Sequence, residues 1–140
     1  MTLKVQKLDT WAASLEDNPG SLAAKLGALA KGGANLQFVI ARRAHERPGT
    51  GVVFVTPIQG SAARRAALKA GFTKTDKLHT VEVQGPDKAG RGAALAQVLA
   101  GGGLNLRGLS AAAIGKKFVC YIALDTQEDA AKAARLLRFL

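Results

Sequence analysis

The sequence contains few of the residues that form disulfides, metal sites and aromatic clusters. Of its 140 residues, one is Cys, two are His and only 5% are aromatic. A single Cys excludes an internal disulfide and suits a reducing compartment, so we expect a cytoplasmic protein. No apolar run approaches the roughly 18 residues of a membrane span. The N-terminal segment "MTLKVQKLDTW" also lacks the pattern of a signal peptide.

Acidic residues are also scarce. Ten Asp and Glu stand against twenty Lys and Arg, which gives a formal net charge of +10. Such a charge attracts anions, including nucleic acid. An RNA-recognition motif, however, needs aromatic side chains on its two central strands. The segments "TWAASLE" and "GVVFVTP" do not supply that pattern. A basic nucleic-acid-binding module therefore stays as the weaker alternative.

The chain has only half of a phosphate-binding motif. Gly85 and Gly90 have the spacing of the two P-loop glycines, but the next residues are Arg91 and Gly92. A P-loop requires Lys and then Ser or Thr there, because these side chains contact phosphate and Mg²⁺. We therefore expect no nucleotide cofactor.

No other catalytic or metal-binding motif is present. His45 and His79 have no Cys, His or carboxylate neighbour at ligand spacing, so we expect no metal site. Cys120 lies in the strand-like run "KFVCYIAL" and is expected to be a small buried hydrophobe. Trp11 is expected to pack in a core or at an interface. Together these features indicate a protein that is not an enzyme and uses no cofactor.

What the sequence does contain is an internal repeat. "GGANL" at 32–36 returns as "GGLNL" at 102–106, and Asp17 and Gly20 return 70 positions later as Asp87 and Gly90. The segment "IQGSAA" at 58 returns as "TQEDAA" 68 positions later. The repeat predicts two domains, 9–75 and 76–140. Units of this size are near the lower limit for a separate core, so we expect them to pack together or to dimerise.

The first copy predicts alternating strands and helices. Asp17 or Asn18 is the expected cap of its first helix, Leu22, Leu26 and Leu29 form one apolar stripe, and Ser61 is the expected cap of the second helix. The predicted elements are a strand at 10–16, a helix at 17–33, a hairpin of strands 35–43 and 51–57, a helix at 60–71 and an extended segment at 72–83. This order is the α+β, ferredoxin-like βαββαβ arrangement, an antiparallel sheet with both helices on one face.

The second copy repeats the order but ends before its closing strand. The predicted elements are a strand at 79–84, a helix at 90–102, strands at 105–112 and 117–124, and a helix at 126–138. Residues 2–8 align with the closing strand of the first copy. We therefore predict that they supply the missing strand of the second.

The turn into the first helix of each copy is the candidate binding site. A helix N-terminus presents unpaired N–H groups to a carboxylate, and Asp17, Asn18 and Asp87 offer oxygen acceptors to an amine. Asn35 and Asn105, at the start of the next strand, are expected to lie close to that turn. Together these groups suit a free α-amino acid. The alternative is that they are ordinary cap and turn residues.

The sequence resembles a tandem pair of ACT domains over nearly its whole length. The resemblance is carried by "EDNPGSLAAKLGALAKGGANLQFV" and, more weakly, by "PDKAGRGAALAQVLAGGGLNLRGL". The first segment follows the ACT form acidic–x–Pro–Gly–x–Leu, then a helix ending in Gly-x-Asn-Ile/Leu, and the second segment follows it in part. The second copy departs from this form, with Ala89 in place of Pro and Gly92 in place of Leu.

The resemblance implies a regulatory, non-catalytic protein that binds a small amino acid between paired domains. It also implies a homodimer and a partner enzyme of amino-acid metabolism. The implied ligand-binding residues are Asp17, Asn18, Gly20, Ser21, Leu22, Asn35 and Leu36, and in the second copy Asp87, Lys88, Gly90, Arg91, Asn105 and Leu106. A structural subunit that binds a partner without any ligand is the main alternative.

Overall fold

The chain forms two compact α+β units. The computed structural model describes the backbone of residues 3–140 and the side chains of residues 3–75 and 78–140. The first unit is Asp9–Thr75, and the second unit is Asp76–Leu140 together with the N-terminal residues up to Leu8. Each unit has the ferredoxin-like arrangement of an antiparallel sheet and two helices.

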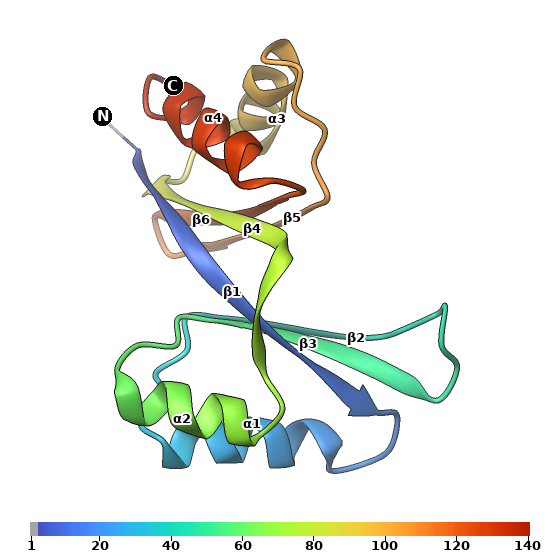
Figure 1. Cartoon of the computed structure of the whole chain (residues 1–140). Coiled ribbons are helices and arrows are strands. Elements are labelled where there is room, and N and C mark those ends of the chain that lie inside the picture. Colours follow the sequence, from blue (N-terminus) through green and yellow to red (C-terminus); the bar gives the residue numbers. More distant parts are fainter. Residues whose placement is uncertain (1–2) are drawn as a thin grey trace. The chain divides into compact units, whose positions relative to one another are not determined.

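The first unit contains the strands in the order β2-β3-β1-β4. Its elements are β1 (Lys4–Glu16), α1 (Ser21–Lys31), β2 (Phe38–Arg43), β3 (Thr50–Thr56), α2 (Ser61–Lys69) and the start of β4 (Thr73–Pro86). β3 lies between β1 and β2, with Val55 opposite both Trp11 and Val39. Helices α1 and α2 cover the same face of this sheet (Figure 1). This is the order of elements that the sequence predicts.

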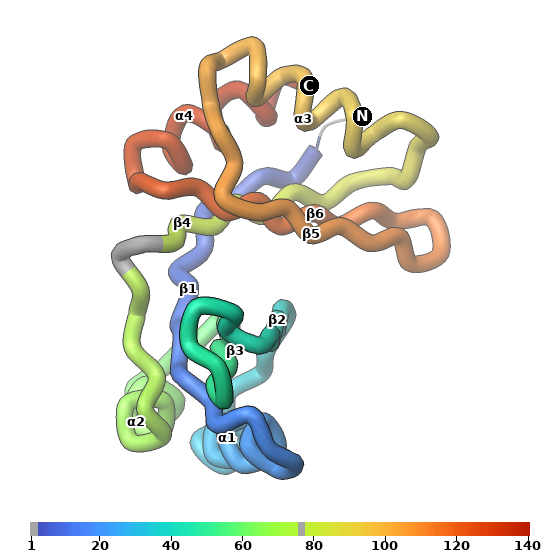
Figure 2. The backbone as a smooth tube through the Cα atoms, turned by 90° about the vertical axis from the view of Figure 1, so that its right-hand side faces the viewer, coloured from blue at the N-terminus to red at the C-terminus, as the bar shows by residue number. Residues whose placement is uncertain are grey.

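The second unit contains the strands in the order β1-β4-β6-β5. Its further elements are α3 (Arg91–Gly101), β5 (Gly108–Ile114), β6 (Lys117–Leu124) and α4 (Gln127–Leu137). β6 lies between β4 and β5, with Cys120 opposite both Val83 and Ala111. Helices α3 and α4 lie on one side of these strands (Figure 2). The edge of the sheet next to β4 is occupied by β1, whose residues up to Leu8 belong to this unit.

Each unit has its own hydrophobic core. In the first unit, Leu29 of α1 is fully buried, and Leu22 and Leu26 pack against the same core, as the predicted stripe requires. Trp11 is 8% exposed and belongs to this core, which confirms its expected role. In the second unit, alternate residues of β6 point to the helices and are buried: Phe118, Cys120, Ile122 and Leu124. The expectation that Cys120 is a buried hydrophobe is therefore confirmed.

The helix caps differ from the prediction. Neither Asp17 nor Asn18 caps α1, because the cap position is Gly20, at φ 93°, and Ser21 is the first helical residue. Ser61 is likewise the first residue of α2 rather than its cap. The chain enters both helices through a glycine with positive φ. Glycine adopts this conformation readily, but it has no side chain that could cap the helix.

The start of β1 is anchored in the second unit by two contacts. Leu3 is 6% exposed and belongs to the core of the second unit. Gly85 of β4 makes room for it, because a Cβ at Gly85 would overlap the Leu3 side chain. Gln6 Nε2 donates a hydrogen bond to Glu82 Oε1 at 2.8 Å. The segment therefore contributes both apolar packing and a hydrogen bond to the buried carboxylate of Glu82.

We predict that Leu3→Ala destabilises the protein by about 2 kcal/mol, because it removes a buried side chain and leaves a cavity. Amide-exchange protection in β5 and β6 should fall. Lys7→Ala, an exposed change on the same strand, is the matched control and should leave exchange unchanged. Unaltered protection of residues 108–124 in Leu3→Ala would contradict the structure.

Because Cys120 is buried, the free energy of unfolding depends on pH in the alkaline range. Desolvation raises the pKa of its thiol from 9.0 to about 11. From about pH 9 upward the unfolded chain loses this proton while the folded chain keeps it, so the free energy of unfolding falls until about pH 11. We predict that the stability difference between wild type and Cys120→Ala narrows over this range in urea titrations. A constant difference would mean that the thiol is not desolvated.

Candidate ligand-binding site

The turn into α1, Asp17–Gly20, is held in place by backbone hydrogen bonds. The N–H of Asp17 donates to the Gly49 carbonyl at 3.0 Å, which ties the turn to the β2–β3 hairpin. The Gly20 carbonyl accepts from Ala24 N–H at 2.9 Å and so begins the helical hydrogen bonds. A side chain at Gly20 would meet no atom within 4 Å, but its positive φ favours glycine.

The polar side chains of this turn already have partners. The Asp17 carboxylate pairs with Arg43 Nε at 2.9 Å, with side-chain exposures of 37% and 78%. Asn18 Nδ2 donates to Glu16 Oε2 at 3.1 Å, and Asn18 Oδ1 accepts from the Ser21 hydroxyl. Exposed pairs of this kind contribute little to stability. Replacement of one of these contacts by a ligand therefore costs little free energy of folding.

A pocket of about 200 Å³ lies beside this turn, between the start of α1 and the ends of β1 and β2. Its lining residues are Leu15, Glu16, Asp17, Asn18, Ser21, Leu22, Ala41, Arg42, Arg43 and Gly51. Four of the candidate residues from the sequence, Asp17, Asn18, Ser21 and Leu22, are among them.

Arg42 and Arg43 line the pocket although no sequence motif marked them as site residues. They lie at the end of β2, where Arg43 is opposite Gly51 of β3. The residue before Gly51, Thr50, is opposite Glu16 at the end of β1. The parallel ends of β1 and β2 thus bring Arg42 and Arg43 to the α1 turn, where the guanidinium group of Arg43 pairs with Asp17. Only a correct prediction of the β2–β3 strand register could have identified these two arginines as site residues.

Asn35 does not lie close to the α1 turn of its own unit, so that expectation was wrong. Helix α1 separates them, and its 11 residues correspond to a length of about 16 Å. Asn105 is separated from the turn of the second copy by α3 in the same way. Leu36 and Leu106 pack against the cores of their units.

The corresponding turn of the second unit is organised differently. The N–H of Asp87 donates to the Lys116 carbonyl at 2.9 Å, as Asp17 does to Gly49. Arg91, however, folds back over the turn, and its Nη2 donates to the Pro86 carbonyl at 2.9 Å. Asp87, Lys88, Gly90 and the distant Asn105 are exposed. The two copies of the site therefore differ in chemistry.

The buried titratable groups of the second unit are not suited to nucleophilic chemistry near neutral pH. Cys120 has a pKa of about 11. The pKa of Tyr121 is raised to about 12 by burial and by the hydrogen bond and charge of Glu82, which lies opposite it. Glu82 Oε1 is already bonded to Gln6 and Gln84. These groups form a structural polar cluster.

The described residues contain neither a candidate metal site nor a helix that could span a membrane. No group of three or more His, Cys, Asp and Glu side chains there is arranged to hold a metal ion. None of the four described helices is long and apolar enough to cross a membrane.

Comparison with solved structures identifies similar folds over almost the whole chain. No protein-family model and no curated protein matches the sequence. Protein BT0572 from Bacteroides thetaiotaomicron has a TM-score of 0.76 at 16% identity, over 94% of this chain and 88% of that one. The ligand-free regulatory subunit of aspartate kinase from Thermus thermophilus has a TM-score of 0.64 at 20% identity, over 98% and 95%.

A longer enzyme contains a similar fold as one part. Aspartokinase III of E. coli, solved in complex with aspartate and ADP, has a TM-score of 0.60 at 18% identity. The alignment covers 96% of this chain but only 32% of that one. At these identities the similarity establishes the fold that the chain shares with regulatory subunits of aspartate kinase.

The α1 turn generates a matched pair of predictions on stability. Gly20→Ala should cost about 1–2 kcal/mol, because it forces a side chain into the left-handed region. Gly27→Ala, in the exposed interior of the same helix, should instead stabilise the protein by about 0.5–1 kcal/mol. Urea unfolding of both variants measures the difference. Equal effects would mean that Gly20 does not hold a positive φ.

Proposed function

We propose that this protein is a non-catalytic regulator of the ACT type that binds a small amino acid, or a related metabolite, in the pocket beside the α1 turn. The observation that carries the proposal is the pocket of about 200 Å³, which brings together acidic, amide and guanidinium groups at the start of a helix. The ACT-like sequence form falls at this same turn. This volume is smaller than that of the usual site for a drug-sized ligand, so the pocket suits only a small metabolite.

The lining groups complement both ends of an amino acid. Arg42, Arg43 and the partial positive charge at the start of α1 attract a carboxylate. The oxygen atoms of Glu16, Asp17 and Asn18 accept hydrogen bonds from an ammonium group. Leu15 and Leu22 offer an apolar surface to a short side chain. In this proposal the ligand replaces part of the Asp17–Arg43 pair.

The proposed setting is a regulatory subunit of an enzyme of amino-acid metabolism. The Thermus thermophilus structure supports this, because it is a regulatory subunit of aspartate kinase and its length matches this chain almost completely. We propose a homodimer in the cytoplasm, with Gly20 of the α1 turn contributing its backbone to the site. The equivalent proposal for the second unit involves Asp87, Lys88, Gly90 and Arg91. Ligand binding would change the packing of the domains and thereby their hold on the enzyme.

A structural subunit without ligand is the second candidate. The outer strands β2 and β5 each carry an exposed large hydrophobic residue, Val39 at 41% and Leu109 at 42% exposure. Outer strands with open backbone groups are common sites of pairing between proteins. In this case the partner would bind whether or not an amino acid is present.

A thermal-shift screen of the purified protein against the twenty amino acids tests the proposal. A ligand at about 100 times its dissociation constant stabilises the folded protein by roughly 2.7 kcal/mol, which raises the melting temperature. We expect one amino acid, or a few related ones, to do so. Asp17→Asn should abolish the shift because it removes an acceptor from the pocket.

Asp9→Asn is the matched control. Asp9 also forms an exposed ion pair in the first unit, with Lys74 at 3.1 Å, but it does not line the pocket. This variant should keep the full shift. An equal loss in both variants would contradict the site, and no shift with any amino acid at millimolar concentration would favour the structural subunit.

A further inference from the structure

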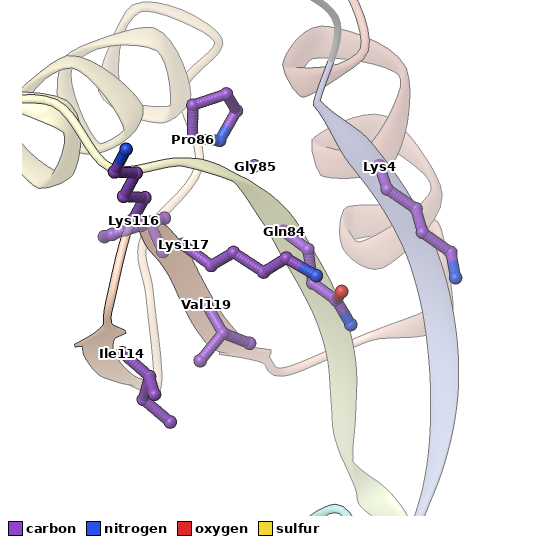
Figure 3. Close-up of a pocket in the computed structure, with 9 residues that line it drawn as sticks. Lys4, Gln84, Gly85, Pro86, Ile114, Lys116, Lys117 and Val119 are labelled. Carbon is purple, nitrogen blue, oxygen red and sulfur yellow. The ribbon is translucent and has the colours of Figure 1, made fainter.

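A larger pocket, of about 630 Å³, is lined entirely by residues of the second unit. It lies where the end of β4 meets the β5–β6 hairpin and the start of β1 (Figure 3). We call it the lysine pocket, because Lys4, Lys116 and Lys117 line it. None of the three lysines lines the pocket at the α1 turn, whereas the backbone carbonyl of Lys116 accepts the hydrogen bond of Asp87 N–H at the corresponding turn of the second unit.

The charge of the lysine pocket is uncompensated. Three of its nine lining residues are lysines and none is acidic. In the part of the chain that the structure describes, none of these three ammonium groups forms an ion pair or a hydrogen bond. Neighbouring like charges repel each other, and an anion bound among them relieves this repulsion. The pocket is therefore electrostatically suited to an anion.

The lysine pocket also has an apolar wall. Ile114 is 76% exposed, more than any other large aliphatic residue that the structure describes as exposed. Val119 lies nearby on β6 and also lines the pocket. Figure 3 shows Ile114 and Val119 on one side, with Lys117 extending across the strands toward the Gln84 amide. A ligand with both an anionic group and an apolar part would use both features.

The strand register explains why these groups meet. Lys117 is opposite Ile114 on β5 and opposite Pro86 on β4, while Val119 is opposite Gln84. Residues that are directly opposite in an antiparallel sheet point to the same face. The short turn at Gly115 and Lys116 places the second lysine at the rim. The pocket is thus built on regular strands and not on a long loop.

The first copy of the repeat lacks this arrangement. The residue pair that corresponds to Pro86 and Lys117 is Glu16 and Thr50, which are also directly opposite each other. The first copy therefore has a carboxylate where the second has an uncharged ring, and a hydroxyl where the second has an ammonium. The lysine pocket is therefore a feature of the second unit that the first unit does not share.

We propose that the lysine pocket is a second binding site, for a small organic anion with a carboxylate or phosphate group and an apolar part. The ammonium group of Lys117, which extends toward the Gln84 amide (Figure 3), holds the anionic group, Lys116 adds positive charge at the rim, and Ile114 and Val119 contact the apolar part. This site is independent of the proposed amino-acid site, since the two share no residue. The protein would therefore bind two different small molecules, one at each site.

The test uses phenyl phosphate, benzoate and inorganic phosphate as probes, with chemical shifts of the backbone amides as readout. Phenyl phosphate should shift the resonances of residues 114–119 and bind more tightly than inorganic phosphate, which lacks the apolar part. Benzoate distinguishes a carboxylate site from a phosphate site. The double variant Lys116→Gln/Lys117→Gln should weaken binding about tenfold or more.

The matched control is Lys69→Gln/Lys132→Gln, which removes the same charge at two exposed positions on helices. It should bind phenyl phosphate as the wild type does. Ile114→Ser should weaken phenyl phosphate but not inorganic phosphate. If both double variants weakened phenyl phosphate binding equally, the net charge of the protein and not the pocket would attract the anion, and this result would overturn the proposal. Shifts confined to other residues, or no binding at millimolar concentration, would also overturn it.

Discussion

The feature on which the structure depends is that the second unit is built from both ends of the chain. β1 begins in the second unit, where Leu3 fills the space above Gly85, and continues into the first unit, where Trp11 enters the core. β4 returns the chain from the first unit to the second. The first unit is therefore an insertion between the N-terminal strand of the second unit and the rest of it. Loss of the anchor at Leu3 would leave the edge of β4 uncovered, and such open edges favour aggregation.

This arrangement conserves the fold while the two copies diverge in chemistry. In both units the turn after the first strand is tied to the neighbouring hairpin by the N–H of an aspartate, Asp17 or Asp87. The first turn opens on a pocket with two arginines, whereas Arg91 folds over the second turn. The second hairpin is short and carries two lysines that the first does not. We therefore regard the chain as one scaffold with two different candidate binding sites.

Much of the fold follows from the repeat and from local patterns. The duplicated segments predict the order of elements in both units, and the alternation of "KFVCYIAL" predicts β6 at the residues where it occurs. Local patterns did not predict the caps, because backbone conformation at Gly20 and Gly60 decided where each helix begins. They also placed Asn35 near the α1 turn, although the helix predicted at 17–33 lies between the two and already separates them.

The candidate sites were only partly predictable for a related reason. Asp17, Asn18, Ser21 and Leu22 are local to one turn, so a motif could identify them. Arg42 and Arg43 join them through pairing of separate strands. The lysine pocket combines Lys4 with residues more than 75 positions away, and only the tertiary structure brings these together.

The most direct test of the shared-strand account is urea unfolding followed with one probe in each unit. The chain has one Trp and one Tyr. Trp11 reports on the first unit by its fluorescence, and fluorotyrosine at position 121 reports on the second by ¹⁹F NMR. Because β1 and β4 run through both units, the account predicts a single transition with the same midpoint for both probes. Two separate midpoints, with one unit remaining folded while the other is unfolded, would contradict it.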